Sequence, residues 1–195
     1  MSSSIANAKQ RTFRIKLILI FLAFTAPVVA AYLSFYVWPP KGRTNYGELI
    51  KATALPDAAL RDDDGNPVSL GKLRGKWLII TVDSANCDGE CDKKLYLMRQ
   101  VRISLSSEMN RVERVLLVRG PGNVSAALLK KYPGMHMLTG ADANLLGRFP
   151  AITDPTDHVY LVDPLGNLMM RYSKNPDAVG VRRDLSRLLS VSRVG

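Results

Sequence analysis

The sequence predicts an α/β fold, a three-layer sandwich around a mixed sheet, preceded by one membrane-spanning helix. Three features indicate it: continuous apolar runs of strand length, amphipathic helical stretches between them, and an uncharged apolar segment over residues 17–38. Strands that alternate with helices and end in a hairpin and a last helix build such a sandwich. With 195 residues and 23% charged side chains, the chain suits one ordered domain plus a short appendage.

The N-terminal segment is expected to anchor the protein in a membrane. Residues 17–38 read LILIFLAFTAPVVAAYLSFYVW, and about 20 such residues span a bilayer core. The tail, residues 1–16, is basic and holds no acid, so it should stay in the cytoplasm and send the rest across. Cleavage of a signal peptide after Val29-Ala30-Ala31 is the alternative. Since no Arg-rich amphipathic presequence precedes the anchor, we expect a bacterial inner membrane with the C-terminal domain in the periplasm.

The formal net charge of +10 does not indicate a nucleic-acid-binding protein. Much of the excess lies in the N-terminal tail and in the basic stretch 171–195, where no aromatic residues interleave the arginines as nucleic-acid binding would require. The basic stretch is interpreted as a solvated helix face, and contact with anionic lipid or an acidic partner is the alternative. We therefore expect a membrane-embedded protein with no nucleic-acid partner.

The order of elements follows from the apolar patterns. Residues 39–55 read as a linker, and the domain is expected over 56–195. Met98, Val101, Leu105 and Met109 recur at helical spacing over 91–109, with Lys94 on another face. The other expected elements are a hairpin over 59–70, strands 77–82 and 112–118, a short helix 124–131, a short strand 135–138, a helix 141–149, a hairpin 158–172 and a final helix carrying Val181, Leu185, Leu188 and Leu189.

Cys87 and Cys91 form the one strongly chemical motif in the sequence. They lie between a buried strand and the start of a helix, so their sulfurs can converge to close a disulfide or to bind one soft metal ion. Asp88, Glu90 and Asp92 disfavour thiolates and attract cations, which favours metal binding. A disulfide that only braces the loop is the plain alternative, but so short a loop removes little entropy from the unfolded chain.

The chain resembles the Sco/SenC family of membrane-anchored, thioredoxin-fold proteins that help assemble the copper site of cytochrome c oxidase. The resemblance covers about residues 55–189 and rests on GKWLIITV before Cys87-x-x-x-Cys91, on Leu138-Thr139-Gly140, and on Asp157-His158 before YLVDPLGN. It implies a thioredoxin-like sandwich that binds copper, as Cu(I) or Cu(II), through both cysteines and a downstream histidine. The matching residues here are Cys87, Cys91 and His158.

Three positions depart from the family pattern. Asp88 and Asp92 stand where the family usually has proline. His158 lies only two residues before Tyr160, about three closer than the family histidine, and Pro155 occupies the ungapped family position. His158 is therefore either the third ligand or a strand-edge residue with a satisfied hydrogen bond. The other histidine, His136, lies between two methionines that strand alternation places on the opposite face, and this pattern is attributed to core packing of the methionines and not to copper binding.

Three functions are consistent with these sequence features. The first is a copper-handling assembly factor that passes copper to an oxidase copper-site subunit, or to its assembly factors, in the same membrane. The second is a thiol-disulfide reductase in which Cys87 attacks a client disulfide and Cys91 resolves the intermediate. The third is a tethered interaction module with no role for the dithiol. We expect the first, and its metal binding should need His158 as well as both cysteines.

Overall fold

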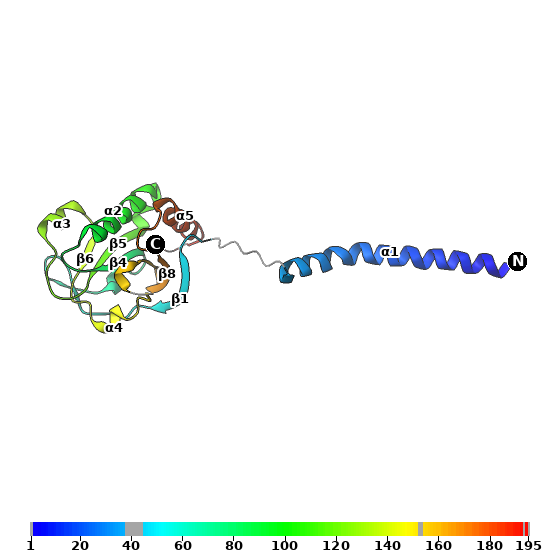
Figure 1. Cartoon of the computed structure of the whole chain (residues 1–195), viewed down its shortest axis with the longest axis horizontal. Helices are drawn as coiled ribbons and strands as arrows, with labels where there is room; N and C mark the ends of the chain where they lie inside the picture. The colour runs from blue at the N-terminus through cyan, green and yellow to red at the C-terminus, as the bar shows by residue number, and fades with distance from the viewer. Residues whose placement is uncertain (1, 38–44, 152–153, 193, 195) are drawn as a thin grey trace. The chain divides into compact units, whose positions relative to one another are not determined.

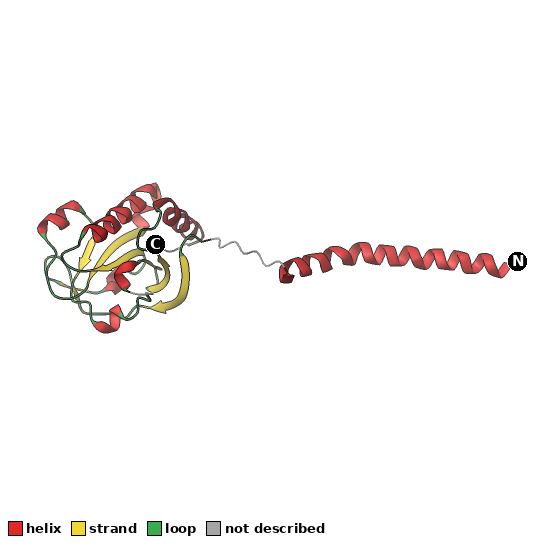
Figure 2. Ribbon diagram, viewed as in Figure 1, coloured by secondary structure: helices red, strands yellow, loops and turns green. Residues whose placement is uncertain are grey.

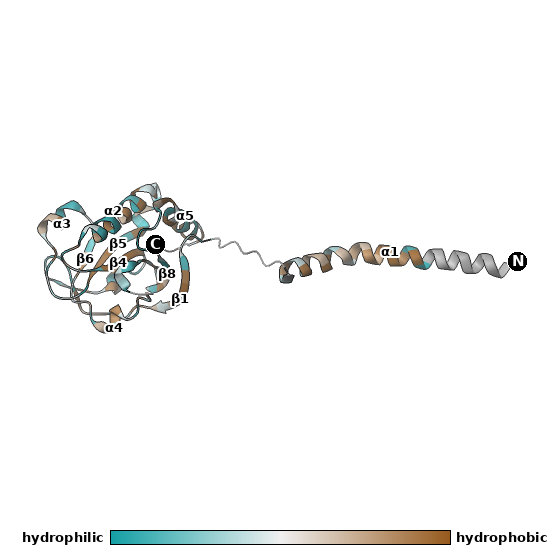
Figure 3. Ribbon diagram, in the orientation of Figure 1, coloured by the Kyte–Doolittle hydropathy of each residue, from teal (hydrophilic) through white to brown (hydrophobic). Residues whose placement is uncertain are grey.

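The computed structural model describes residues 2–37, 45–151, 154–192 and 194, and it divides into two units, 1–44 and 45–195. In the first, α1 runs over Ser2–Val37, and its apolar part, Arg14–Tyr36, is long enough and apolar enough to cross a membrane. Figure 3 shows hydrophobic colour along most of this part. The helix confirms the expected candidate anchor, whereas Trp38, the last residue of the expected span, lies outside the described residues.

The second unit is built around a six-stranded mixed sheet with the strand order β1-β8-β7-β4-β5-β6 (Figure 1). Strands β4, β5 and β6 are parallel, whereas β7, β8 and β1 each pair antiparallel with their inner neighbour. The strands are β1 (Glu48–Ala54), β4 (Trp77–Asp83), β5 (Val112–Val118), β6 (His136–Leu138), β7 (Val159–Val162) and β8 (Asn167–Tyr172). A separate two-stranded hairpin joins β2 (Leu60–Arg61) to β3 (Pro67–Val68).

Helices and loops cover both faces of the sheet, as a three-layer sandwich requires (Figure 2). Side chains of β4 alternate between two core clusters: Ile79 packs in the cluster that contains α2 and α5 side chains, and Ile80 packs in the opposite one. The helices are α2 (Gly89–Ser104), α3 (Ala126–Lys131), α4 (Ala143–Leu146) and α5 (Ala178–Val191), with 3-10 turns η1 (Leu70–Leu73), η2 (Ser106–Arg111) and η3 (Pro155–Asp157). The expected fold class is confirmed.

Two elements differ from the sequence expectation. Residues 48–54, within the segment expected to be a linker, form β1 at the edge of the sheet; most of its side chains are exposed, so no buried apolar pattern marks it. The helix expected over 91–109 ends earlier, because Leu105 caps α2 and a 3-10 turn follows. Met109 is consequently 36% exposed and leaves the buried stripe, whereas Met98 is fully buried.

Candidate metal and redox site

The cysteine pair lies where the central strand passes into α2. Strand β4 is buried over nearly its whole length and is followed by a loop. Helix α2 then begins at Gly89. Cys87 precedes the N-cap residue Asp88, and Cys91 lies in the first turn. The two cysteines form a disulfide with a Cα–Cα distance of 5.0 Å. Their expected convergence is therefore confirmed, although Cys87 lies outside the helix and has a positive φ of 40°.

The two sulfur-bearing residues differ in exposure. Cys91 is fully buried in the core cluster with Leu95 and Met98, whereas Cys87 is half-buried at its edge. A partner molecule or an incoming ion therefore meets Cys87 first. This asymmetry suits thiol exchange, in which one sulfur must be attacked and its partner must stay shielded.

The three acids around the pair are each engaged by hydrogen bonds or cations. The Asp88 carboxylate accepts the amides of Glu90 and Cys91, and these bonds lower its pKa. Lys93 lowers the pKa of Glu90 by a hydrogen bond of 2.7 Å. The carboxylate of Asp92 accepts from Lys131 and Tyr132, again with a lowered pKa.

These acids therefore do not form the open negative field that the sequence indicated. Asp88 caps the helix, and the charges of Glu90 and Asp92 are compensated by lysines. The cation that binds Asp92 comes from α3, which is remote in sequence and could not be anticipated from the local pattern.

His158 directly precedes β7 and is 8% exposed. Its Nδ1 lies 2.9 Å from the carbonyl oxygen of Tyr172. Because a carbonyl can only accept, Nδ1 carries the proton and the lone pair of the neutral ring lies on Nε2. This Nε2 is buried and has no hydrogen-bond partner among the residues that the structure describes.

The structure brings two of the three expected ligands together. Among the described residues, no group of three or more His, Cys, Asp or Glu side chains is arranged to hold a metal ion. Cys87 and Cys91 are joined, and His158 is not grouped with them in this disulfide state. His136 is partly exposed between buried Met135 and Met137, as core packing by the methionines requires.

Lys94 lies on the buried face of α2, contrary to the expectation from the sequence. Its side chain is 1% exposed, and its Nζ donates to Asp83 at 2.7 Å and to the carbonyl of Thr156 at 2.5 Å. The position follows Cys91 by three residues and precedes Met98 by four, which is the spacing of one helix face. The spacing therefore indicated a buried position, but the positive charge of lysine favoured an exposed one.

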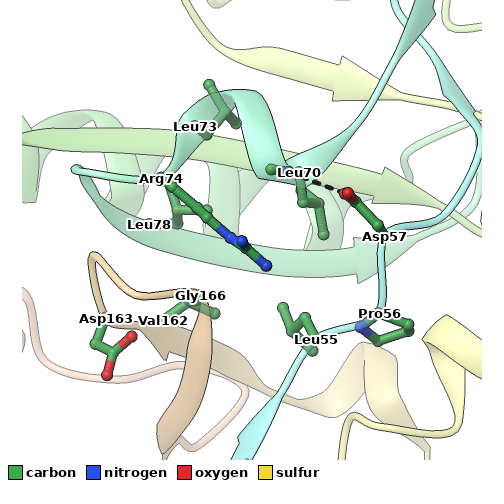
Figure 4. A pocket seen from close by; sticks show the side chains of 11 residues that line it. Leu55, Pro56, Asp57, Leu70, Leu73, Arg74, Leu78, Val162, Asp163 and Gly166 are labelled. Carbon is green, nitrogen blue, oxygen red and sulfur yellow. Dashed lines mark hydrogen bonds between the residues drawn. The ribbon is translucent and has the colours of Figure 1, made fainter.

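A small pocket lies on the face of the sheet that does not contain Cys91. It is therefore not part of the cysteine site. Figure 4 shows it between η1 and the β7–β8 turn, with the Arg74 side chain extending into it. Leu70, Leu78 and Val162 line it, and all belong to the cluster that does not contain Cys91. With about 10 Å³ available to the centre of a water molecule, it has room for roughly one water.

The mixed sheet, the strand-to-helix dithiol and the candidate membrane span together define a thioredoxin-like dithiol protein with an N-terminal anchor. The sequence model of one family, described as a transmembrane-like, thioredoxin-like, C-terminal domain, matches residues 77–192. The chain belongs to this family. No curated protein sequence matches the chain.

Solved structures of Sco proteins are similar in fold. Copper-bound yeast Sco1 superposes with a TM-score of 0.62 at 24% identity, covering 73% of this chain and 96% of that one. A SCO1/SenC family lipoprotein from Bacillus anthracis gives 0.55 at 22%, covering 72% and 99%. Copper-bound ScoI from Bradyrhizobium japonicum gives 0.54 at 19%, covering 69% and 99%. The expected resemblance to the Sco/SenC family is thus confirmed at the level of the fold.

Proposed function

We propose that this chain is a membrane-tethered copper-handling factor that serves the assembly of a respiratory cytochrome oxidase. The observation that carries the proposal is the Cys87–Cys91 pair at the junction of β4 and α2, in a fold shared with copper-bound Sco1 and ScoI. Copper is the cargo, and the thiolates of Cys87 and Cys91 hold it. His158 supplies the third ligand.

The chemistry of this donor set suits copper. An external dithiol must first reduce the disulfide to two thiols by thiol exchange, and become a disulfide itself, because only the reduced sulfurs bind metal. Binding then releases the thiol protons. Two thiolates are soft ligands that prefer Cu(I), and an added imidazole also accommodates Cu(II).

The state of His158 supports its role as a ligand. Histidines that bind metals through one ring nitrogen commonly donate the other N–H to a carbonyl or carboxylate, which fixes the tautomer. Nδ1 of His158 makes such a bond to Tyr172, and Nε2 keeps a buried lone pair that has no partner in the described part of the chain. Buried polar atoms normally have partners, so this nitrogen is available for one. The proposal requires Nε2 to reach the thiolates once the disulfide is reduced.

The membrane anchor gives the proposal its location. The basic tail 1–16 would remain in the cytoplasm and the anchor 17–38 would cross a bacterial inner membrane, placing the domain in the periplasm. An oxidase copper-site subunit or its assembly factors would then be reached by diffusion within one membrane. The oxidising periplasm also accounts for the disulfide of the resting protein.

The test is oxidase maturation in cells that produce either the wild-type chain or single variants. Cys87→Ser and His158→Ala should both lower the copper content and the activity of the membrane oxidase, at equal amounts of the chain. Ser84→Ala, an exposed change in the same loop, is the control. Normal oxidase in both site variants would contradict the proposal.

The asymmetric disulfide also supports a second candidate, a thiol-disulfide reductase. In this reaction the Cys87 thiolate attacks a client disulfide and releases one client thiolate. The Cys91 thiolate then attacks the Cys87 sulfur, which restores the Cys87–Cys91 disulfide and releases the second client thiolate. This activity would survive His158→Ala and fail in Cys87→Ser. A pure interaction module would tolerate loss of both cysteines, which separates all three functions.

A further inference from the structure

Lys94 is the most deeply buried cationic side chain among the described residues near the cysteine pair. It comes from α2, one turn after Cys91, and its ammonium group lies between the carboxylate of Asp83 and the carbonyl of Thr156. Asp83 ends β4 and Thr156 lies in η3. One ammonium group therefore connects the strand before Cys87, the helix that carries Cys91, and the turn before His158.

Stability alone is a poor explanation for this ion pair. Removing an ammonium from water is costly, and replacing a buried pair with apolar side chains of similar volume is often neutral or stabilising. A buried charge on the helix face that also carries Cys91 and Met98 therefore points to a requirement for geometry.

The segment before His158 is held by cations on several sides. Lys94 binds the carbonyl of Thr156, Arg119 pairs with Asp154 at 2.9 Å, and Lys174 pairs with Asp157 at 3.1 Å. The pairs made by Arg119 and Lys174 are substantially exposed, so solvent screens them. The bond from Lys94 is shielded and short, and it acts two residues from the imidazole.

We propose that Lys94 is a positioning residue that fixes the His158 segment against the dithiol and thereby sets the copper affinity of the site. This inference rests on the proposed function. Lys94 itself touches no copper ligand atom; it acts through the Thr156 carbonyl. Residues that orient metal ligands in this way typically change metal affinity about 10–100-fold when replaced.

The experiment is a double-mutant cycle on the full-length chain in detergent. Cu(I) affinity of the reduced protein is measured against a competing chelator for wild type, Lys94→Met, His158→Ala and the double variant. We expect Lys94→Met to weaken binding at least about tenfold and to have no further effect once His158 is alanine. Equal losses in both backgrounds would overturn the inference, because Lys94 would then act independently of His158.

Two controls keep the outcome interpretable. Lys51→Met removes an exposed lysine of β1, outside the cysteine site, and should leave the affinity unchanged. The double variant Lys94→Met/Asp83→Asn removes both charges of the pair. If its copper affinity returns to the wild-type value, the loss in Lys94→Met came only from the unpaired Asp83. That result would count against Lys94 as a positioning residue.

A readout without metal separates this inference from the proposed function. Hydrogen exchange of the amides over 156–159 in the copper-free protein should accelerate in Lys94→Met and stay unchanged in Lys51→Met. If the wild type binds no Cu(I) but the exchange behaves as expected, the proposed function fails while the positioning role stands. Unchanged exchange overturns the positioning role whatever the copper result.

Discussion

Reduction of the Cys87–Cys91 disulfide should leave the domain folded, with only a small loss of stability. Cys87 and Cys91 are separated by four positions, so the crosslink closes a very short loop. The chain-entropy relation gives about 2 kcal/mol for a loop of that size. In the opposite direction, the positive φ of Cys87 costs about 1 kcal/mol in the oxidised fold. The net loss of stability on reduction is therefore about 1 kcal/mol.

This magnitude corresponds to a fall in the melting temperature of about 2–4 °C for a chain of this size. The assay is thermal unfolding of the full-length protein in detergent, followed by circular dichroism with and without a phosphine reductant. The Cys87→Ser/Cys91→Ser variant, which has no disulfide under either condition, shows the direct effect of the reductant.

A much larger effect would refute the reasoning. If reduction unfolds the domain at room temperature, the disulfide is a structural brace, and the reduced dithiol cannot serve as a folded copper site. A small shift supports a bond that can open and close in the working protein.

Three further predictions concern stability. Asp184→Ala should lower the free energy of unfolding by about 2–4 kcal/mol, because the buried carboxylate accepts hydrogen bonds from the amides of Tyr46 and Gly47. Urea unfolding measures this change, and Ser186→Ala, at an exposed position of the same helix, is the control that should show no loss. Met98→Ala should cost about 2–5 kcal/mol and Met109→Ala less than about 1, since Met98 is fully buried and Met109 lies beyond the end of α2; similar losses would contradict the observed helix end. The pKa of Asp92 is lower in the folded protein than in the unfolded chain, where it is about 3.9. The stability that this carboxylate contributes is complete above the unfolded pKa and is lost as the pH falls through the folded pKa. The urea midpoints measured at pH 7 and below pH 4 should therefore differ less in Asp92→Asn than in wild type.

The parts of the fold that the sequence predicted are those with strong local patterns. The run Trp77 to Val82 has no charge and is buried in the centre of the sheet, and Val112 to Val118 pairs beside it. The edge strand Glu48–Ala54 lacks such a pattern because it exposes most of its side chains. Its pairing with β8 depends on a strand more than a hundred residues away, which local periodicity cannot reveal.

The site shows the same division. Spacing alone predicted that Cys87 and Cys91 converge, because both lie within one strand-to-helix junction. It could not show that Lys131 of α3 binds Asp92, or that Lys94 is buried against the turn before His158, since these contacts join distant segments. The tautomer of His158 likewise depends on a carbonyl of β8.

Anaerobic titration of the reduced full-length chain with Cu(I), against a competing chelator, tests the central claim most directly. Wild type should bind one copper ion tightly, and Cys87→Ser and His158→Ala should each weaken that binding sharply. Binding that survives His158→Ala but not Cys87→Ser would leave a two-thiolate site and favour thiol exchange. No competitive binding by the wild type would contradict the account.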